Sequence, residues 1–115
     1  MNLIYISVGF FLFAAMLGSR LLYAVLTDKP TPKLIVLLHG PIAITGLVLL
    51  IIFLSNTPSY YLTFAVVAFI VAACLGVYML IRDMRRKPGP KSVALVHVLF
   101  ALVGIICVAV FLFLI

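Results

Sequence analysis

The sequence predicts an all-α integral membrane protein, a four-helix up-down-up-down bundle built from two parallel helical-hairpin repeats. Three observations predict this fold. First, the 115 residues are 68% hydrophobic and 9% charged, with a mean hydropathy of +1.48, so the chain has too few polar side chains to cover a water-soluble globule. Second, the apolar residues form long runs that are separated by short basic segments. Third, the second half of the chain repeats features of the first half at a constant offset, which brings Lys29 onto Lys87.

Four apolar runs predict membrane-spanning helices. Each reaches the roughly 20 residues that an α-helix needs to cross the hydrocarbon layer. None alternates polar and apolar residues with a period of two, which favours helices over barrel strands. The predicted spans are 3–27, 34–54, 61–81 and 92–115. They use nearly the whole chain, so we expect a single membrane domain over 1–115, and the first run lacks the basic leader of a signal peptide.

The placement of Lys and Arg predicts the orientation. All of these cations except Arg20 lie in or beside the connections at 28–33 and 82–91, whereas the connection at 55–60 is neutral. Cytoplasmic loops carry the excess of positive charge. We therefore expect both basic loops on the cytoplasmic side of a bacterial inner membrane and both termini outside. The net charge of +6 then reflects topology and anionic lipid headgroups, and no nucleic-acid partner is expected.

The internal repeat is clearest in the basic loops. Residues 29–40 read KPTPKLIVLLHG and residues 87–98 read KPGPKSVALVHV. The same offset places AAMLG at 14–18 on AACLG at 72–76. The repeats cover about 1–57 and 58–115. Because each has two spans, the second enters the membrane in the same direction as the first, which predicts a pseudo-two-fold axis along the membrane normal.

The two histidines, His39 and His97, occupy equivalent positions in the repeats. Each lies six residues, or about 9 Å, beyond the second lysine of its basic loop. The second and fourth spans of such a bundle lie diagonally opposite, so the imidazoles should face one another. Two opposed imidazoles predict axial ligation of one haem b. This coordination leaves no open iron position, which favours one-electron transfer by an oxidoreductase or electron-transfer component that exchanges electrons with a quinone or a redox protein.

Glycines and cations are expected to complete the haem site. Small residues on the ligand face and on the neighbouring spans would leave room for the macrocycle. These glycines are Gly18, Gly46, Gly76 and Gly104. Cations toward the cytoplasmic side would pair with the haem propionates. These cations are Lys33, Lys91 and Arg82 near the loops and Arg20 inside the first span.

Arg20 is the one charge well inside a predicted span, about eight residues or 12 Å from the loop. Its equivalent in the second repeat is Tyr78, so the repeats differ here. An unpaired guanidinium at this depth is costly. Two interpretations stay open: a propionate partner, and a side chain that snorkels toward the headgroups.

The units 29–46 and 87–104 resemble the histidine-bearing helices of transmembrane b-type cytochromes. The shared pattern is a basic residue, then a histidine, then a glycine about two turns later. The resemblance implies a four-helix membrane bundle that holds haem through histidines on paired helices. Members of that family often carry two haems and four histidines, so the two histidines of this chain imply a single bis-histidine haem.

Two other functions remain open from the residues alone. A non-catalytic scaffold or assembly protein would use the histidines to pack helices. A small transporter would use them as titrating groups, although Asp28 and Asp83, the only acids, lie at the loop edges. A metal site without porphyrin is disfavoured because two histidines are fewer ligands than zinc takes. The oligomeric state, monomer or homodimer, also stays open.

Overall fold

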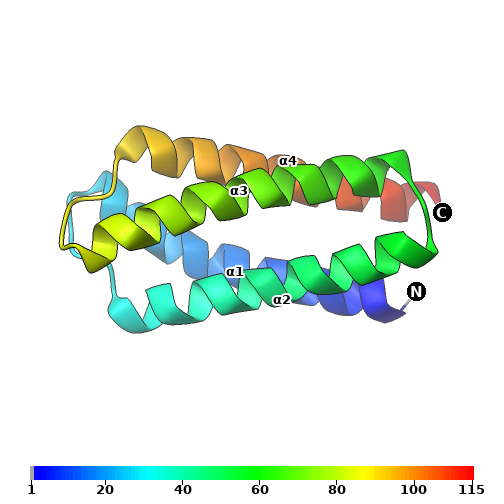
Figure 1. Cartoon of the computed structure of the whole chain (residues 1–115), viewed down its shortest axis with the longest axis horizontal. Helices are drawn as coiled ribbons and strands as arrows, with labels where there is room; N and C mark the ends of the chain where they lie inside the picture. The colour runs from blue at the N-terminus through cyan, green and yellow to red at the C-terminus, as the bar shows by residue number, and fades with distance from the viewer. Residues whose placement is uncertain (1) are drawn as a thin grey trace.

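The computed structural model describes residues 2–115, which form four α-helices (Figure 1). The helices are α1 (Asn2–Leu26), α2 (Lys33–Asn56), α3 (Tyr60–Met84) and α4 (Lys91–Leu114). All four are long and apolar enough to cross a membrane. The prediction of an all-α chain with four apolar helices is therefore confirmed, and every helix end falls within three residues of the predicted span.

The helices lie side by side in an elongated bundle of 43 × 23 × 19 Å. The connections at 27–32 and 85–90 lie together at one end, called the loop end below (Figure 1). The connection at 57–59 and the two chain ends lie at the opposite end, called the terminal end (Figure 1). α1 packs mainly against α2, and α3 against α4, whereas contacts between these two hairpins are sparser. The bundle is thus two tight hairpins laid against each other.

The turn after α1 closes the helix with a left-handed residue. Asp28 has φ 56°, and its backbone N–H donates to the carbonyl of Val25 at 3.3 Å. The N–H of Lys29 donates to the carbonyl of Ala24 at 2.8 Å. This pair of bonds is the Schellman arrangement, which satisfies helix-end carbonyls that would otherwise lack partners.

The turn after α3 has the same backbone form. Arg86 also has φ 56°, and its N–H donates to the carbonyl of Asp83 at 3.0 Å. The N–H of Lys87 donates to the carbonyl of Arg82 at 3.0 Å. Glycine commonly takes the left-handed position in this motif, so an arginine there stores some backbone strain.

The large buried side chains gather in the half of the bundle toward the terminal end. This cluster consists of Ile4, Phe11, Leu47, Leu50, Phe53, Leu62, Ala65, Phe69, Val108 and Phe111. The buried residues of the loop-end half are small. They are Ala14, Ala24, Ala72 and Ala94. Small residues let neighbouring helices approach closely. In this half the imidazole rings of His39 and His97 lie between the helices.

Candidate functional site

The two imidazole rings meet between the hairpins in the loop-end half. His39 lies on α2 and His97 on α4, and their ring centroids are 6.2 Å apart with an angle of 70° between the ring planes. Both residues are half-buried. The structure thus brings together the two side chains that the sequence marks as candidate ligands.

Each histidine is held by the other helix of its own hairpin. Nδ1 of His39 lies 2.9 Å from the carbonyl oxygen of Ala14, and Nδ1 of His97 lies 2.6 Å from that of Ala72. A carbonyl oxygen can only accept, so in each neutral ring Nδ1 carries the proton and donates it. Nε2 then keeps its lone pair, and this is the tautomer in which a histidine ligates a metal through Nε2.

Gly18 and Gly76 provide the space in which the rings lie. A Cβ at Gly18 would stand 2.9 Å from Cε1 of His39, and one at Gly76 would stand 3.3 Å from Cε1 of His97. Both distances are shorter than an ordinary contact. The glycines therefore let each imidazole lie against the backbone of the neighbouring helix, where the carbonyl acceptor is found.

Gly46 and Gly104 accommodate phenyl rings. A Cβ at Gly46 would lie 3.2 Å from Cε1 of Phe11, and one at Gly104 would lie 2.7 Å from Cε1 of Phe69. These two phenyl rings stack on each other with centroids 4.0 Å apart and an angle of 9° between planes. Phe11 precedes Ala14 by three residues, so the stack lies about one helical turn from the histidine level, toward the terminal end. Aromatic side chains therefore lie against these two glycines, where the sequence predicts room for a macrocycle.

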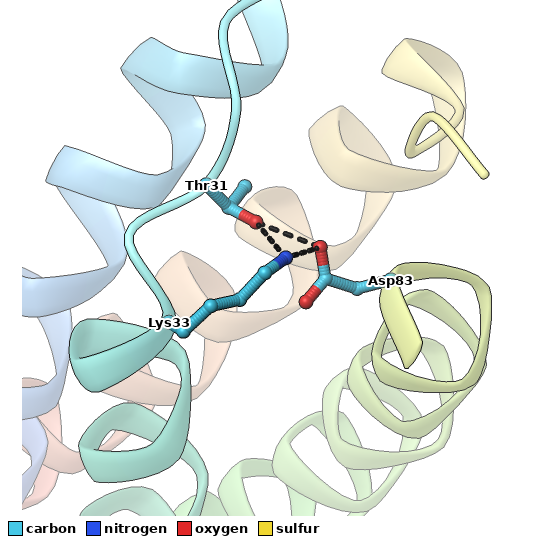
Figure 2. A network of polar contacts seen from close by, with 3 residues as sticks. All are labelled: Thr31, Lys33 and Asp83. Atoms are coloured by element: carbon cyan, nitrogen blue, oxygen red, sulfur yellow. Dashed lines mark hydrogen bonds and ion pairs between the residues drawn. The ribbon is translucent and has the colours of Figure 1, made fainter. Parts of the chain in front are cut away.

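Lys33 and Lys91 form ion pairs at the loop end. Nζ of Lys33 lies 2.7 Å from Oδ1 of Asp83, which also accepts a hydrogen bond from the hydroxyl of Thr31 at 2.7 Å (Figure 2). Nζ of Lys91 lies 3.2 Å from Oδ2 of Asp28. Each pair joins one hairpin to the other. The two lysines therefore lie at the loop end as predicted, in contact with carboxylates.

Arg20 is exposed on α1. Its guanidinium carbon lies 5.7 Å from the centre of the Tyr23 ring. Within residues 2–115 no hydrogen bond or ion pair joins the Arg20 side chain to another group. The other predicted propionate partners, Lys33, Lys91 and Arg82, bind groups outside their own helices.

The described chain contains no group of three or more His, Cys, Asp or Glu side chains that could hold a metal ion. The thiols of Cys74 and Cys107 are free. Two imidazoles suffice only for a metal that brings its other ligands with it, as a porphyrin iron does.

Sequence reasoning missed the residues that support the histidines. Phe11 and Phe69 fill the bundle next to them, and the carbonyls of Ala14 and Ala72 orient them. The offset between the repeats pairs Phe11 with Phe69 and Ala14 with Ala72. Alignment of the two repeats could therefore have identified these four residues.

Comparison of the chain with protein-family models, curated proteins and solved structures finds no match.

Proposed function

We propose that this chain is a membrane-integral b-type cytochrome that binds one haem b through His39 and His97 and passes single electrons. The observation that carries the proposal is the histidine pair itself. The two rings come from different hairpins and lie edge to face, with centroids 6.2 Å apart and 70° between their planes, and both have Nδ1 engaged by a backbone carbonyl.

The spacing of the rings fits a single metal held between them. Two metal–nitrogen bonds of about 2 Å, extended by half a ring on each side, separate imidazole centroids by about 6 Å. The centroid distance of 6.2 Å agrees with this estimate. The sparse contact between the hairpins also supports a bound group in this place. A group inserted between the hairpins would disrupt less side-chain packing than one inserted within a hairpin.

The chain's own residues would orient the ligands and exclude water. The carbonyls of Ala14 and Ala72 fix the ring orientation and raise the basicity of Nε2, as outer-shell hydrogen bonds do at metal sites. The stacked rings of Phe11 and Phe69 close the site on the terminal side with apolar surface. Bound haem would supply the one-electron redox couple, and two histidine ligands would leave its iron without an open position.

The lysines would supply positive charge on the loop side. Lys33 and Lys91 are the first residues of α2 and α4, six residues before the respective histidines. At about 1.5 Å per residue they lie about 9 Å further toward the loop end. Their ion pairs with Asp83 and Asp28 hold both ammonium groups over the inter-hairpin region, where propionates of a haem would need cations.

The up-down-up-down topology with two parallel repeats belongs to the same proposal. Its support is that equivalent residues meet in pairs across the bundle. His39 meets His97, Phe11 meets Phe69, and the rings of Phe53 and Phe111 lie 6.0 Å apart. Self-pairing of equivalent residues at three levels is what a pseudo-two-fold axis along the bundle produces.

The environment proposed for the cytochrome is the bacterial inner membrane, with the loop end in the cytoplasm and both termini outside. The cations of the loop-end connections support this orientation. A quinone within the bilayer or a redox protein at its surface would exchange the electron.

The test is the visible spectrum of the purified protein in detergent, oxidised and dithionite-reduced, after supplementation with haem. We expect a sharp Soret band and narrow reduced α and β bands that are lost in both His39→Ala and His97→Ala. Gly9→Ala is the control because it adds a methyl group to a helical glycine of α1 where a Cβ meets no atom within 4 Å. It should keep the full spectrum.

A colourless wild-type protein would refute the cytochrome. Capture of a stable protein partner would then favour the scaffold, and a pH-dependent flux lost on substitution of either histidine would favour the transporter.

A further inference from the structure

A cluster of two cations and a phenol lies on the exposed face of α1 near the loop end. The Arg20 guanidinium carbon is 5.7 Å from the centre of the Tyr23 ring, and Nζ of Lys29 is 5.1 Å from the same centre. Nζ of Lys29 also donates a hydrogen bond to the Tyr23 hydroxyl oxygen at 3.3 Å. Two positive charges are thus gathered around one aromatic ring, and the phenol keeps its own O–H for another acceptor.

No acidic side chain of the chain is free to balance these charges. The sequence contains two Asp or Glu residues in all. Asp83 is bound to Lys33 and Asp28 to Lys91. Arg20 and Lys29 are exposed and have no carboxylate partner among the described residues. Two like charges near one ring repel each other, so an external anion would be bound favourably here.

The position of the cluster selects the kind of anion. Tyr23 and Arg20 precede Asp28, where the chain turns at the end of α1, by five and eight residues. On the helix these intervals are about 8 Å and 12 Å, so an arginine side chain that points toward the loop end reaches the headgroup layer. A phosphate in that layer would lie beside a ring that has a guanidinium carbon 5.7 Å and an ammonium nitrogen 5.1 Å from its centre.

The second repeat lacks the cluster. The offset between the repeats places Tyr78 on Arg20, Ile81 on Tyr23 and Lys87 on Lys29. Only the lysine is kept. The arginine of α3, Arg82, donates from Nε and Nη2 to the carbonyl of Pro88, and among the described residues no cation lies against a tyrosine ring of α3. The site would therefore occur once per chain in spite of the repeated helices.

We propose that Arg20, Tyr23 and Lys29 form a binding site for the phosphodiester headgroup of one anionic phospholipid. The guanidinium and the ammonium group donate charge-assisted hydrogen bonds to the phosphate oxygens, and the phenol donates a third. This proposal is independent of the histidine pair and of haem.

The experiment titrates the detergent-solubilised full chain with phosphatidylglycerol and counts bound lipids by native mass spectrometry. We expect one tightly bound lipid per wild-type chain, and binding about fivefold weaker in Arg20→Gln and in Lys29→Gln. Lys87→Gln is the matched control because it removes the same charge from the equivalent place in the second repeat. It should bind as the wild type does. Far-UV circular dichroism and gel filtration identify variants that remain folded, and affinities are compared among these.

Three outcomes would overturn the site. Equal weakening by Lys87→Gln would mean general charge attraction over the loop end. Unchanged binding in both Arg20→Gln and Lys29→Gln would mean that the lipid binds elsewhere. Displacement of the lipid by an equal concentration of inorganic phosphate would mean that the cluster takes a soluble anion.

Discussion

The contact between Gly18 and His39 gives a sharp test of how the imidazole is positioned. We consider Gly18→Ala, a single added methyl group on α1. That methyl would lie 2.9 Å from Cε1 of His39, whereas ordinary contact begins at 3.4 Å. The ring must therefore move away from α1 until the two carbons are in ordinary contact. The movement strains the 2.9 Å hydrogen bond from Nδ1 to the carbonyl of Ala14.

The magnitude follows from a comparison with Gly9→Ala on the same helix, where the new methyl meets no atom within 4 Å. Replacing a helical glycine by alanine stabilises by about 1 kcal/mol, and Gly9→Ala should show this gain in full. Gly18→Ala has the same gain but adds overpacking of about 1–3 kcal/mol and a weakened hydrogen bond of about 1 kcal/mol. Gly18→Ala should thus be about 2–4 kcal/mol less stable than Gly9→Ala.

The assay is reversible unfolding in mixed detergent micelles, followed by circular dichroism, for the two variants without added haem. Gly76→Ala provides an intermediate case. Its methyl would lie 3.3 Å from Cε1 of His97, so its unfolding free energy should fall less than that of Gly18→Ala. Equal unfolding free energies for Gly18→Ala and Gly9→Ala would refute the reasoning, since Gly18 would then have no role in positioning the ring.

Three further predictions concern the bundle around the site. Asp83→Asn should lower the unfolding free energy by less than about 1 kcal/mol, because the Lys33 side chain is 66% exposed and water screens the pair. High salt should reduce the difference between this variant and the wild type, and a difference unchanged by salt would contradict the ion-pair explanation. Arg86→Gly should raise the unfolding free energy by about 1 kcal/mol, because glycine adopts φ 56° without strain; a destabilised variant would contradict this. Ser7→Ala should cost about 1 kcal/mol in the same unfolding assay, because the fully buried Ser7 hydroxyl donates to the carbonyl of Gly46 at 2.7 Å. An unfolding free energy equal to that of the wild type would mean that another interaction replaces the hydrogen bond from Ser7.

The helices could be predicted from sequence because hydropathy sums over some 20 residues, so no single side chain decides the result. The level of the histidines was also predictable. Equal spacing from two equivalent loops places them at one height, and their rings are 6.2 Å apart. Neither prediction depends on the rotation of a helix about its own axis.

Side-chain partners depend on that rotation, which the sequence leaves open here. A membrane helix is apolar on every face, so no polar stripe marks the side that points inward. The sequence predicts small residues near the histidines but does not show that Phe11 lies against Gly46. It predicts Lys33 at the loop end but does not show that its carboxylate partner is Asp83, 50 positions away in the chain. Packing of the hairpins, rather than any local pattern, selects these neighbours.

The pairing of equivalent residues has a consequence for how the molecule can vary. If the bundle were an assembly of two identical hairpins, one codon would specify both members of every such pair, and each mutation would alter the centre twice. In a single chain the two positions change separately. Phe11 and Phe69 are the same residue type where they touch, whereas residues 20 and 78 are arginine and tyrosine on exposed faces. A single chain thus permits a bundle in which the facing residues at the centre are alike while the two outer sides present different side chains to the lipid.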